Sequence, residues 1–134
     1  MSDAESMTSL CLQLGYDSSF EDIISRLKRA SEDKSSGVYV YEVDGMVRGW
    51  IQVAIRSAIE SGERAEIIGL VVAEGYRGTG IGRKLVEQAE TWARGMGQKS
   101  IRVRTNVVRE GADKFYRAMG FEENKKQTVF DKVL

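Results

Sequence analysis

Apolar positions in the first 35 residues repeat at the spacing of an α-helix, which predicts two helices. The apolar positions of the first are Met7, Leu10, Cys11 and Leu14, and those of the second are Phe20, Ile23, Ile24 and Leu27. Gly15 is placed to end the first helix, and Ser19 is placed to cap the second. The sequence therefore predicts a pair of helices ahead of any strand.

The spacing then changes to one that is typical of strands. Residues 38–43 and 46–56 are predicted to be antiparallel strands, because Asp44-Gly45 between them is a strong hairpin signal. After a polar turn at 57–63, residues 65–72 form an almost continuous apolar run. Such a run predicts a central strand, since both of its faces would be buried.

Helical and strand spacings alternate in the second half of the chain. The predicted elements are a helix from Ile81 to Met96, a strand over 100–105, a helix over 110–119 that Gly120 closes, and a strand over 127–133 with a short partner at 121–122. The whole order predicts one α/β (α+β) domain over residues 1–134. Its sheet is expected to be mixed, mostly antiparallel, and covered by helices on both faces.

A glycine-rich turn, Arg77-Gly-Thr-Gly-Ile-Gly82, lies where the strand ending at Val72 gives way to a helix. Glycine lets a backbone approach a ligand closely, and the first amides of a helix have no partner within it. Together with the helix dipole these amides favour an anion such as a phosphate, and Arg77 adds a fixed positive charge. The turn lacks the Gly-Lys-Ser/Thr end of a P-loop and the glycine spacing of a dinucleotide-binding fingerprint.

Composition narrows the chemistry further. The chain has no histidine and one cysteine, Cys11, so a Ser-His-Asp triad, a His-ligated metal site and an internal disulfide are excluded. We expect no metal, and we interpret Cys11 as a small core residue, since free cysteine is among the most often buried residues. The general acid and the general base must then be carboxylates, tyrosine, lysine or water.

Charge is distributed unevenly along a chain whose net charge is zero. Residues 1–66 hold 12 acids and 7 bases, whereas residues 77–109 hold 8 bases and 2 acids. The basic part suits a polyanionic ligand, while the neutral total argues against a nucleic acid as partner. No apolar run is long enough to span a membrane, and the polar start lacks the features of a secretory signal, so a cytoplasmic location is expected.

The run from Glu66 to Leu85 resembles the cofactor-binding motif of the GCN5-related N-acetyltransferase (GNAT) family. The turn of that family, Arg/Gln-x-x-Gly-x-Gly/Ala, is filled completely by residues 77–82. A second stretch agrees in the right order: Asn106, Ala112, Phe115-Tyr116 and Met119-Gly120-Phe121. This family usually opens with a short strand before the first helix, whereas this sequence begins almost at the helix, so that strand is missing, frayed or outside the predicted elements. An incomplete first strand would leave a sheet edge open to pairing, and a homodimer is common in the family.

The resemblance implies acetyl-CoA as co-substrate, in a cleft where two parallel strands splay apart. These are the strand that ends at Val72 and the strand at 100–105. The implied contacts are Leu70, Val71 and Val72 to the pantetheine arm, Arg77, Gly78, Thr79, Gly80, Ile81, Gly82 and Arg83 to the pyrophosphate, and Asn106 from the opposite wall. Further candidates for the 3′-phosphate, with a solvated surface as the alternative, are Arg83, Lys84, Arg102, Arg104 and Arg109.

The expected reaction is acetyl transfer to a primary amine by direct attack in a ternary complex, because no plausible nucleophile for a covalent intermediate is present. Tyr116 is the candidate acid, with a core tyrosine as the alternative. Glu66 is the weaker candidate, as base. It alternates with Ile68, Leu70 and Val72, and so is expected to face the cofactor positions. The alternatives for Glu66 are a structural ion pair, a solvated strand-edge carboxylate, or a base function carried by water.

The acidic first half favours a small cationic acceptor such as an aminoglycoside or a polyamine. A protein lysine or N-terminal amine is the alternative acceptor, and a non-catalytic acyl-CoA-binding module is the alternative function. The sequence pattern does not identify the amine, since a fold hosts many substrates.

Overall fold

The computed structural model describes residues 20–104 and 111–134. The predicted helix at 7–14 lies outside these residues, as do Cys11, Ser19, Asn106 and Arg109. The chain divides into two compact units, Met1–Arg104 and Thr105–Leu134, and each is described by itself. None of the helices in the described ranges is long and apolar enough to cross a membrane.

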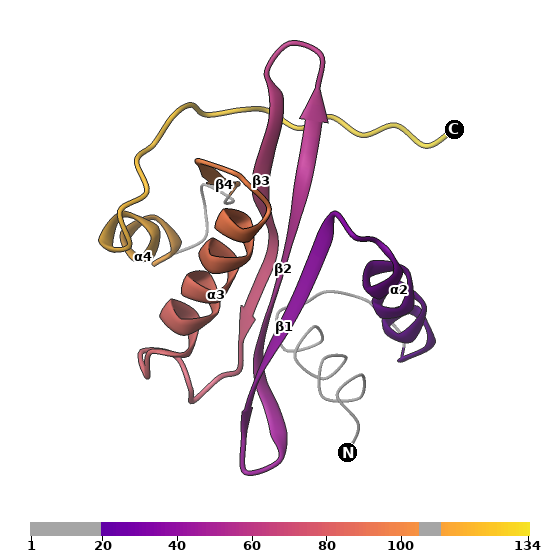
Figure 1. The fold of residues 1–134 in the computed structure, drawn as a ribbon. Helices are drawn as coiled ribbons and strands as arrows, with labels where there is room; N and C mark the ends of the chain where they lie inside the picture. Colours follow the sequence, from indigo (N-terminus) through magenta and orange to yellow (C-terminus); the bar gives the residue numbers. More distant parts are fainter. Residues whose placement is uncertain (1–19, 105–110) are drawn as a thin grey trace. The chain divides into compact units, whose positions relative to one another are not determined.

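The described part of the first unit, residues 20–104, contains two helices and four strands in the predicted order (Figure 1). In sequence they are α2 (Phe20–Glu32), β1 (Ser36–Val43), β2 (Met46–Ala58), β3 (Gly62–Val72), α3 (Ile81–Gly95) and β4 (Ile101–Val103). The strands β2 and β3 run well into the polar stretch that was expected to be a turn, and they leave only residues 59–61 as the loop. Polar residues are tolerated there because the ends of this hairpin are exposed to solvent.

The four strands form one sheet in the order β1-β2-β3-β4. The strands β1, β2 and β3 pair antiparallel, and β4 pairs parallel to β3. The prediction of a central apolar strand is confirmed, because β3 lies between β2 and β4. The expected mixed, mostly antiparallel sheet is confirmed as well.

A β-bulge interrupts β3 where it pairs with β2. Gln52 pairs with Gly69 and Val53 pairs with Ile67, so Ile68 is left without a partner on β2. One extra residue reverses the alternation of side chains beyond it. Two residues on either side of Ile68 that a regular strand would place on the same face therefore point to opposite faces of the sheet.

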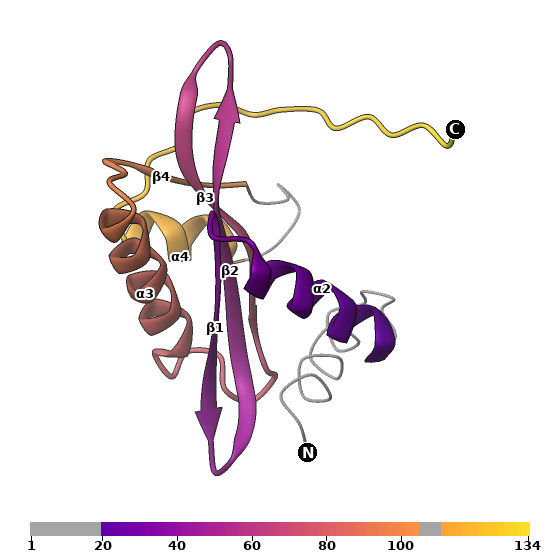
Figure 2. The same cartoon turned by 45° about the vertical axis from the view of Figure 1, so that its right-hand side comes forward.

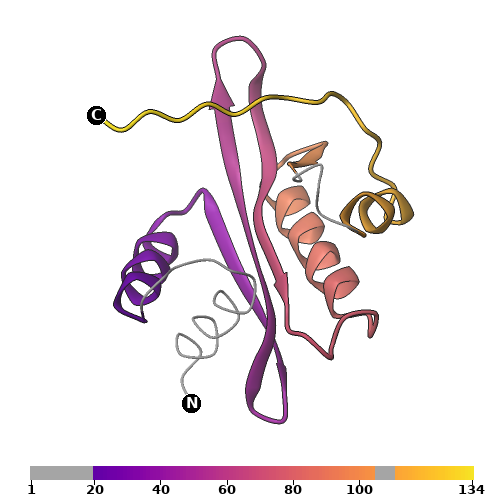
Figure 3. The same cartoon turned by 180° about the vertical axis from the view of Figure 1, so that it is seen from behind.

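Helices α2 and α3 lie on opposite sides of the sheet (Figures 2 and 3). On the α2 side, Ile23 packs in a cluster with Val47, Val71 and Ala73. On the α3 side, the buried residues of the helix are Ile81, Leu85, Val86, Ala89 and Ala93. Full burial of one such aliphatic side chain contributes about 1.5–3 kcal/mol, so the sheet is stabilised from both faces.

The helix α3 approaches the sheet closely at Gly49 of β2. A Cβ atom at Gly49 would lie 2.9 Å from Ile81 Cγ2 and 3.1 Å from Leu85 Cδ1. Glycine is therefore required here for space. The close approach fixes the first turn of α3 against β2.

Over residues 111–134, the second unit contains one helix, α4 (Ala112–Ala118), which agrees with the predicted helix at 110–119. The strands predicted at 121–122 and 127–133 are wrong, because residues 121–134 have no regular secondary structure. A strand is stable only with a partner to accept its backbone hydrogen bonds, and this segment has none among the described residues. Its apolar side chains are exposed, with Val129 82% and Phe130 88% accessible.

Candidate active site

The glycine turn leads directly into α3. Gly80 is the N-cap of the helix with φ 90°, and no side chain caps it. A Cβ atom at Gly80 would meet nothing within 4 Å. Glycine is needed at this position because of its backbone conformation, and the space beside it is open to a ligand.

The start of α3 has the features of an anion-binding site. The first hydrogen bond of the helix runs from Lys84 N to Gly80 O at 3.1 Å, so the amides of Ile81, Gly82 and Arg83 have no acceptor within the helix. The first turn contains no acidic residue. Unpaired amides at the positive end of a helix dipole favour a phosphate group. These residues therefore fit the pyrophosphate that the resemblance implies.

Contacts within the turn hold it against the end of β3. Arg77 Nε donates to Val72 O at 3.4 Å, and the Thr79 hydroxyl donates to Tyr76 O. The Arg48 guanidinium lies over the Tyr76 ring, 4.8 Å from its centroid. The turn is thus ordered before any ligand arrives, which lowers the entropic cost of binding.

The strands β3 and β4 are paired over three residues only. Ala65, Glu66 and Ile67 pair with Ile101, Arg102 and Val103. Beyond Ile67 comes the bulge, and the described residues include no strand that pairs with Leu70–Val72 on the β4 side. The parallel pair that was expected beside the cofactor is present. Among the described residues no strand pairs with Leu70 and Val71 on this side, and Val72 O accepts from Arg77 Nε. Such a strand edge suits an extended polar chain such as a pantetheine arm.

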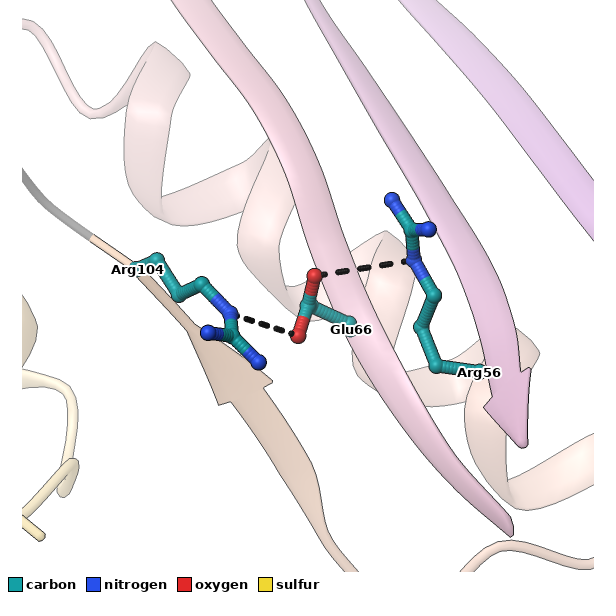
Figure 4. A network of polar contacts seen from close by, with 3 residues as sticks. All are labelled: Arg56, Glu66 and Arg104. Carbon is teal, nitrogen blue, oxygen red and sulfur yellow. Dashed lines mark hydrogen bonds and ion pairs between the residues drawn. The ribbon is translucent and has the colours of Figure 1, made fainter. Parts of the chain in front are cut away.

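Glu66 is buried, with 7% of its surface exposed, and it lies between two arginines (Figure 4). Arg104 Nε is 3.1 Å from Glu66 Oε1, and Arg56 Nε is 3.6 Å from Glu66 Oε2. The alternative of a solvated strand-edge carboxylate is therefore wrong, and the alternative of an ion pair is realised. A role as base stays a prediction.

The expected direction of the Glu66 side chain is wrong. Glu66 pairs with Ala54, whereas Leu70 and Val72 pair with Ile51 and Gly49. The bulge at Ile68 places Leu70 and Val72 on the α3 side and Glu66 on the α2 side. The inference failed because it assumed an unbroken period of two, and the single extra residue reverses it.

Tyr116 lies in α4 of the second unit and is half-buried. Its ring makes edge-to-face contacts with Phe115 at 5.0 Å and with Phe121 at 5.4 Å. Such contacts restrict the ring and orient its hydroxyl. The assignment of Tyr116 as acid stays a prediction.

The basic candidates for the 3′-phosphate differ in their surroundings. Lys84 Nζ is 3.4 Å from the Tyr41 hydroxyl and 5.6 Å from the centre of its ring, whereas Arg83 is exposed. Arg104 binds Glu66. Arg56 was not among the predicted site residues, because only strand pairing brings it from β2 to Glu66 on β3. Gly69 within a strand was the available signal for the bulge.

The sheet, the open end of its parallel pair and the bare helix start define an α/β domain that suits a phosphate-bearing cofactor. The sequence matches the Acetyltransferase (GNAT) family over residues 4–121. The chain therefore belongs to this family, and the family expected from the motifs is confirmed. The enzyme class expected from the motifs, an acetyltransferase, agrees with the description of this family.

Individual relatives agree with the family. An uncharacterized N-acetyltransferase of Methanocaldococcus jannaschii is 35% identical over 101 residues, which are 74% of this chain and 43% of that protein. An aminoglycoside N(6')-acetyltransferase type 1 of Stenotrophomonas maltophilia is 26% identical over 124 residues, which are 89% of this chain and 81% of that protein. The chain thus spans less than half the length of the archaeal relative.

A solved structure supports the fold. The aminoglycoside N-acetyltransferase AAC(6')-Iy in complex with CoA has a TM-score of 0.82 and is 19% identical to this chain. The match covers 97% of this chain and 92% of that one. At this identity the likeness establishes the α/β fold alone.

Proposed function

We propose that the chain transfers the acetyl group of acetyl-CoA to a primary amine in a ternary complex. The observation that carries this proposal is the uncapped start of α3 beside the open end of the β3–β4 pair. The first feature suits a pyrophosphate, and the second suits the chain that links it to the thioester. Family membership supplies the chemistry that joins them.

The proposed cofactor contacts follow from this arrangement. Backbone groups of Leu70, Val71 and Val72 hold the pantetheine arm, and the amides at residues 78–83 hold the pyrophosphate together with Arg77. Open space beside Gly78 and Gly80 supports the second contact. Asn106 is proposed to contact the cofactor from the β4 side.

The reaction requires a neutral amine, an oxyanion donor and a proton for the leaving thiolate. The amine nitrogen bonds to the carbonyl carbon, the carbon–sulfur bond breaks, and the ammonium proton passes to a base. We assign the acid to Tyr116, because a phenol with an ordinary pKa of about 10 is protonated at neutral pH. Glu66 is proposed as base, directly or through water, which its position beside the opening supports.

The proposed acceptor is a small amine, and a cationic one such as an aminoglycoside or a polyamine is the first class to test. The acidic excess in residues 1–66 and the aminoglycoside acetyltransferase among the relatives support it. A protein amine is the alternative. A homodimer is supported by the position of β1 at an edge of the described sheet, and light scattering in solution tests it.

The decisive experiment is an amine panel with acetyl-CoA, read by release of free thiol. Turnover on at least one amine supports the proposal. If acetyl-CoA raises the melting temperature but no amine gives thiol release, the chain is a non-catalytic acyl-CoA-binding module. Glu66→Gln tests the base: full activity of this variant at low pH would contradict the assignment.

A further inference from the structure

Four arginines gather around Glu66 on the α2 side of the sheet, and we call them the arginine cluster: Arg56, Arg64, Arg102 and Arg104. Strand register places them there. Arg56 is the cross-strand partner of Arg64, and Glu66 is the partner of Arg102. Directly opposite residues share a face of the sheet. Arg104 follows two residues after Arg102 and reaches the same carboxylate.

Among the residues that the structure describes, the cluster places four arginines around the single carboxylate of Glu66. Like charges directly opposite each other, as at Arg56 and Arg64, destabilise a sheet. Within the described ranges no ion pair joins Arg64 or Arg102 to a carboxylate. The side chains of Arg56 and Arg104 are 62% and 57% exposed, while Glu66 is buried beneath them. The positive charge therefore faces outward.

The cluster borders the open end of the parallel pair. Glu66 and Arg102 are paired one residue before Ile67 and Val103, where the pairing stops. Leu70 and Val72 lie on the α3 side of the same strand, whereas the cluster lies on the α2 side. A molecule that reached the opening from the α2 side would pass the arginine cluster.

We propose that the arginine cluster binds a carboxylate that lies beside the reacting amine, so that the acceptor is an amino acid. This inference rests on the proposed function. It narrows the class of acceptor from any small amine to one that also carries a carboxylate, which makes it a zwitterion. Guanidinium groups bind carboxylates through paired hydrogen bonds, and Glu66 provides the opposite charge for the ammonium. The two charges of an α-amino acid match the two charges at this site.

Near the bound acceptor, the positive charge of the arginine cluster outweighs the net negative charge of residues 1–66. Interactions between exposed charges are largely screened beyond about 8–10 Å at physiological salt. The acidic excess in residues 1–66 thus attracts a cationic ligand as it approaches. The arginine cluster, in contrast, binds the group that lies next to the amine. A basic amino acid satisfies both, since it is cationic overall and carries a carboxylate. Polyamines and aminoglycosides lack that carboxylate.

The test compares matched acceptors that differ in one group. Lysine, lysine α-amide and a polyamine are each supplied with acetyl-CoA, and kcat/KM is measured by thiol release. The acid is expected to exceed the amide by about tenfold or more, which is the range of charge-assisted hydrogen bonds. Conversion to the amide makes the α-amine less basic and so increases its neutral fraction. A preference for the acid therefore cannot arise from amine protonation.

Arg64→Gln tests the cluster itself, because Arg64 makes no ion pair with Glu66 in the described structure. This variant is expected to reduce the ratio of kcat/KM for acid over amide. A merely structural effect would lower both values and leave the ratio intact. Arg94→Gln is the control, since Arg94 is an exposed residue of α3 that pairs with Glu90, and it should leave the ratio unchanged.

Equal values for acid and amide, a preference for the polyamine, or an unchanged ratio in Arg64→Gln would each overturn the inference. If no amine is turned over, the proposed function fails, and calorimetric binding of lysine and its amide to the CoA-bound protein decides the inference separately. Tighter binding of the acid that Arg64→Gln abolishes would support the cluster. Equal binding would overturn it.

Discussion

Gly80→Ala isolates the contribution of one backbone conformation to cofactor binding. Gly80 has φ 90°, and an added Cβ atom would touch nothing within 4 Å. The left-handed conformation costs a non-glycine residue about 1–2 kcal/mol. Reduced freedom of the unfolded chain returns about 0.4–1 kcal/mol. The expected net loss of stability is about 1 kcal/mol, because no packing changes.

This loss has two measurable consequences. The melting temperature should fall by about 3–5 °C for a chain of this length. Alternatively, the free variant relieves part of this strain by rotating the turn, which makes the fall in melting temperature smaller and directs the amides of α3 away from the ligand. Binding must then restore the strained conformation, so the Kd for acetyl-CoA should rise by up to about fivefold for 1 kcal/mol. Isothermal calorimetry and thermal unfolding measure the two effects.

Gly45→Ala is the matched control. Gly45 has φ 78° in the β1–β2 hairpin, and its Cβ position is likewise empty. It should lower the melting temperature by a similar amount and leave the Kd unchanged. If the Kd rises, the turn takes part in holding the cofactor; a full fall in melting temperature with a wild-type Kd means that the turn keeps its conformation in the free variant. A melting temperature and a Kd that both stay at their wild-type values would refute the argument about conformation.

Three further variants test separate parts of the structure. Gly49→Ala places a Cβ atom 2.9 Å from Ile81 Cγ2, so it should cost about 1–3 kcal/mol in chemical denaturation and weaken acetyl-CoA binding; wild-type stability would contradict the close approach. Tyr116→Phe should lower kcat by about 100-fold with an unchanged Kd for acetyl-CoA, and an unaltered kcat across the pH range would exclude Tyr116 as acid. The Ser35 hydroxyl donates to Asp33 Oδ1 at 2.6 Å, and this bond, followed by the one from the Ser35 amide, holds the pKa of Asp33 below its usual 3.8. A lowered pKa stabilises the folded state at pH values above the pKa of the unfolded chain. Ser35→Ala should therefore lower the melting temperature at neutral pH, and its difference from the wild-type melting temperature should shrink as the pH falls below 3.8. A difference in melting temperature that does not depend on pH would contradict this.

The order of the elements in the first unit was readable from the sequence, because its signals are local. The Asp44-Gly45 turn sets the β1–β2 hairpin, and both residues have positive φ as such a turn requires. The helical spacing from Ile81 onward sets α3, and four of its predicted apolar positions, Ile81, Leu85, Val86 and Ala89, are buried. The strand predicted at 127–133 failed, because its residues favour extended structure without supplying a partner.

The sequence by itself determined the family, the glycine turn and the identity of the candidate residues. The tertiary structure decided which residues act together. The bulge at Ile68 sends Glu66 to the α2 side and Leu70 to the α3 side, and strand pairing brings Arg56 to a carboxylate ten residues away. Register depends on hydrogen bonds between strands that are distant in sequence. One unpaired residue is therefore enough to redirect every side chain that follows it.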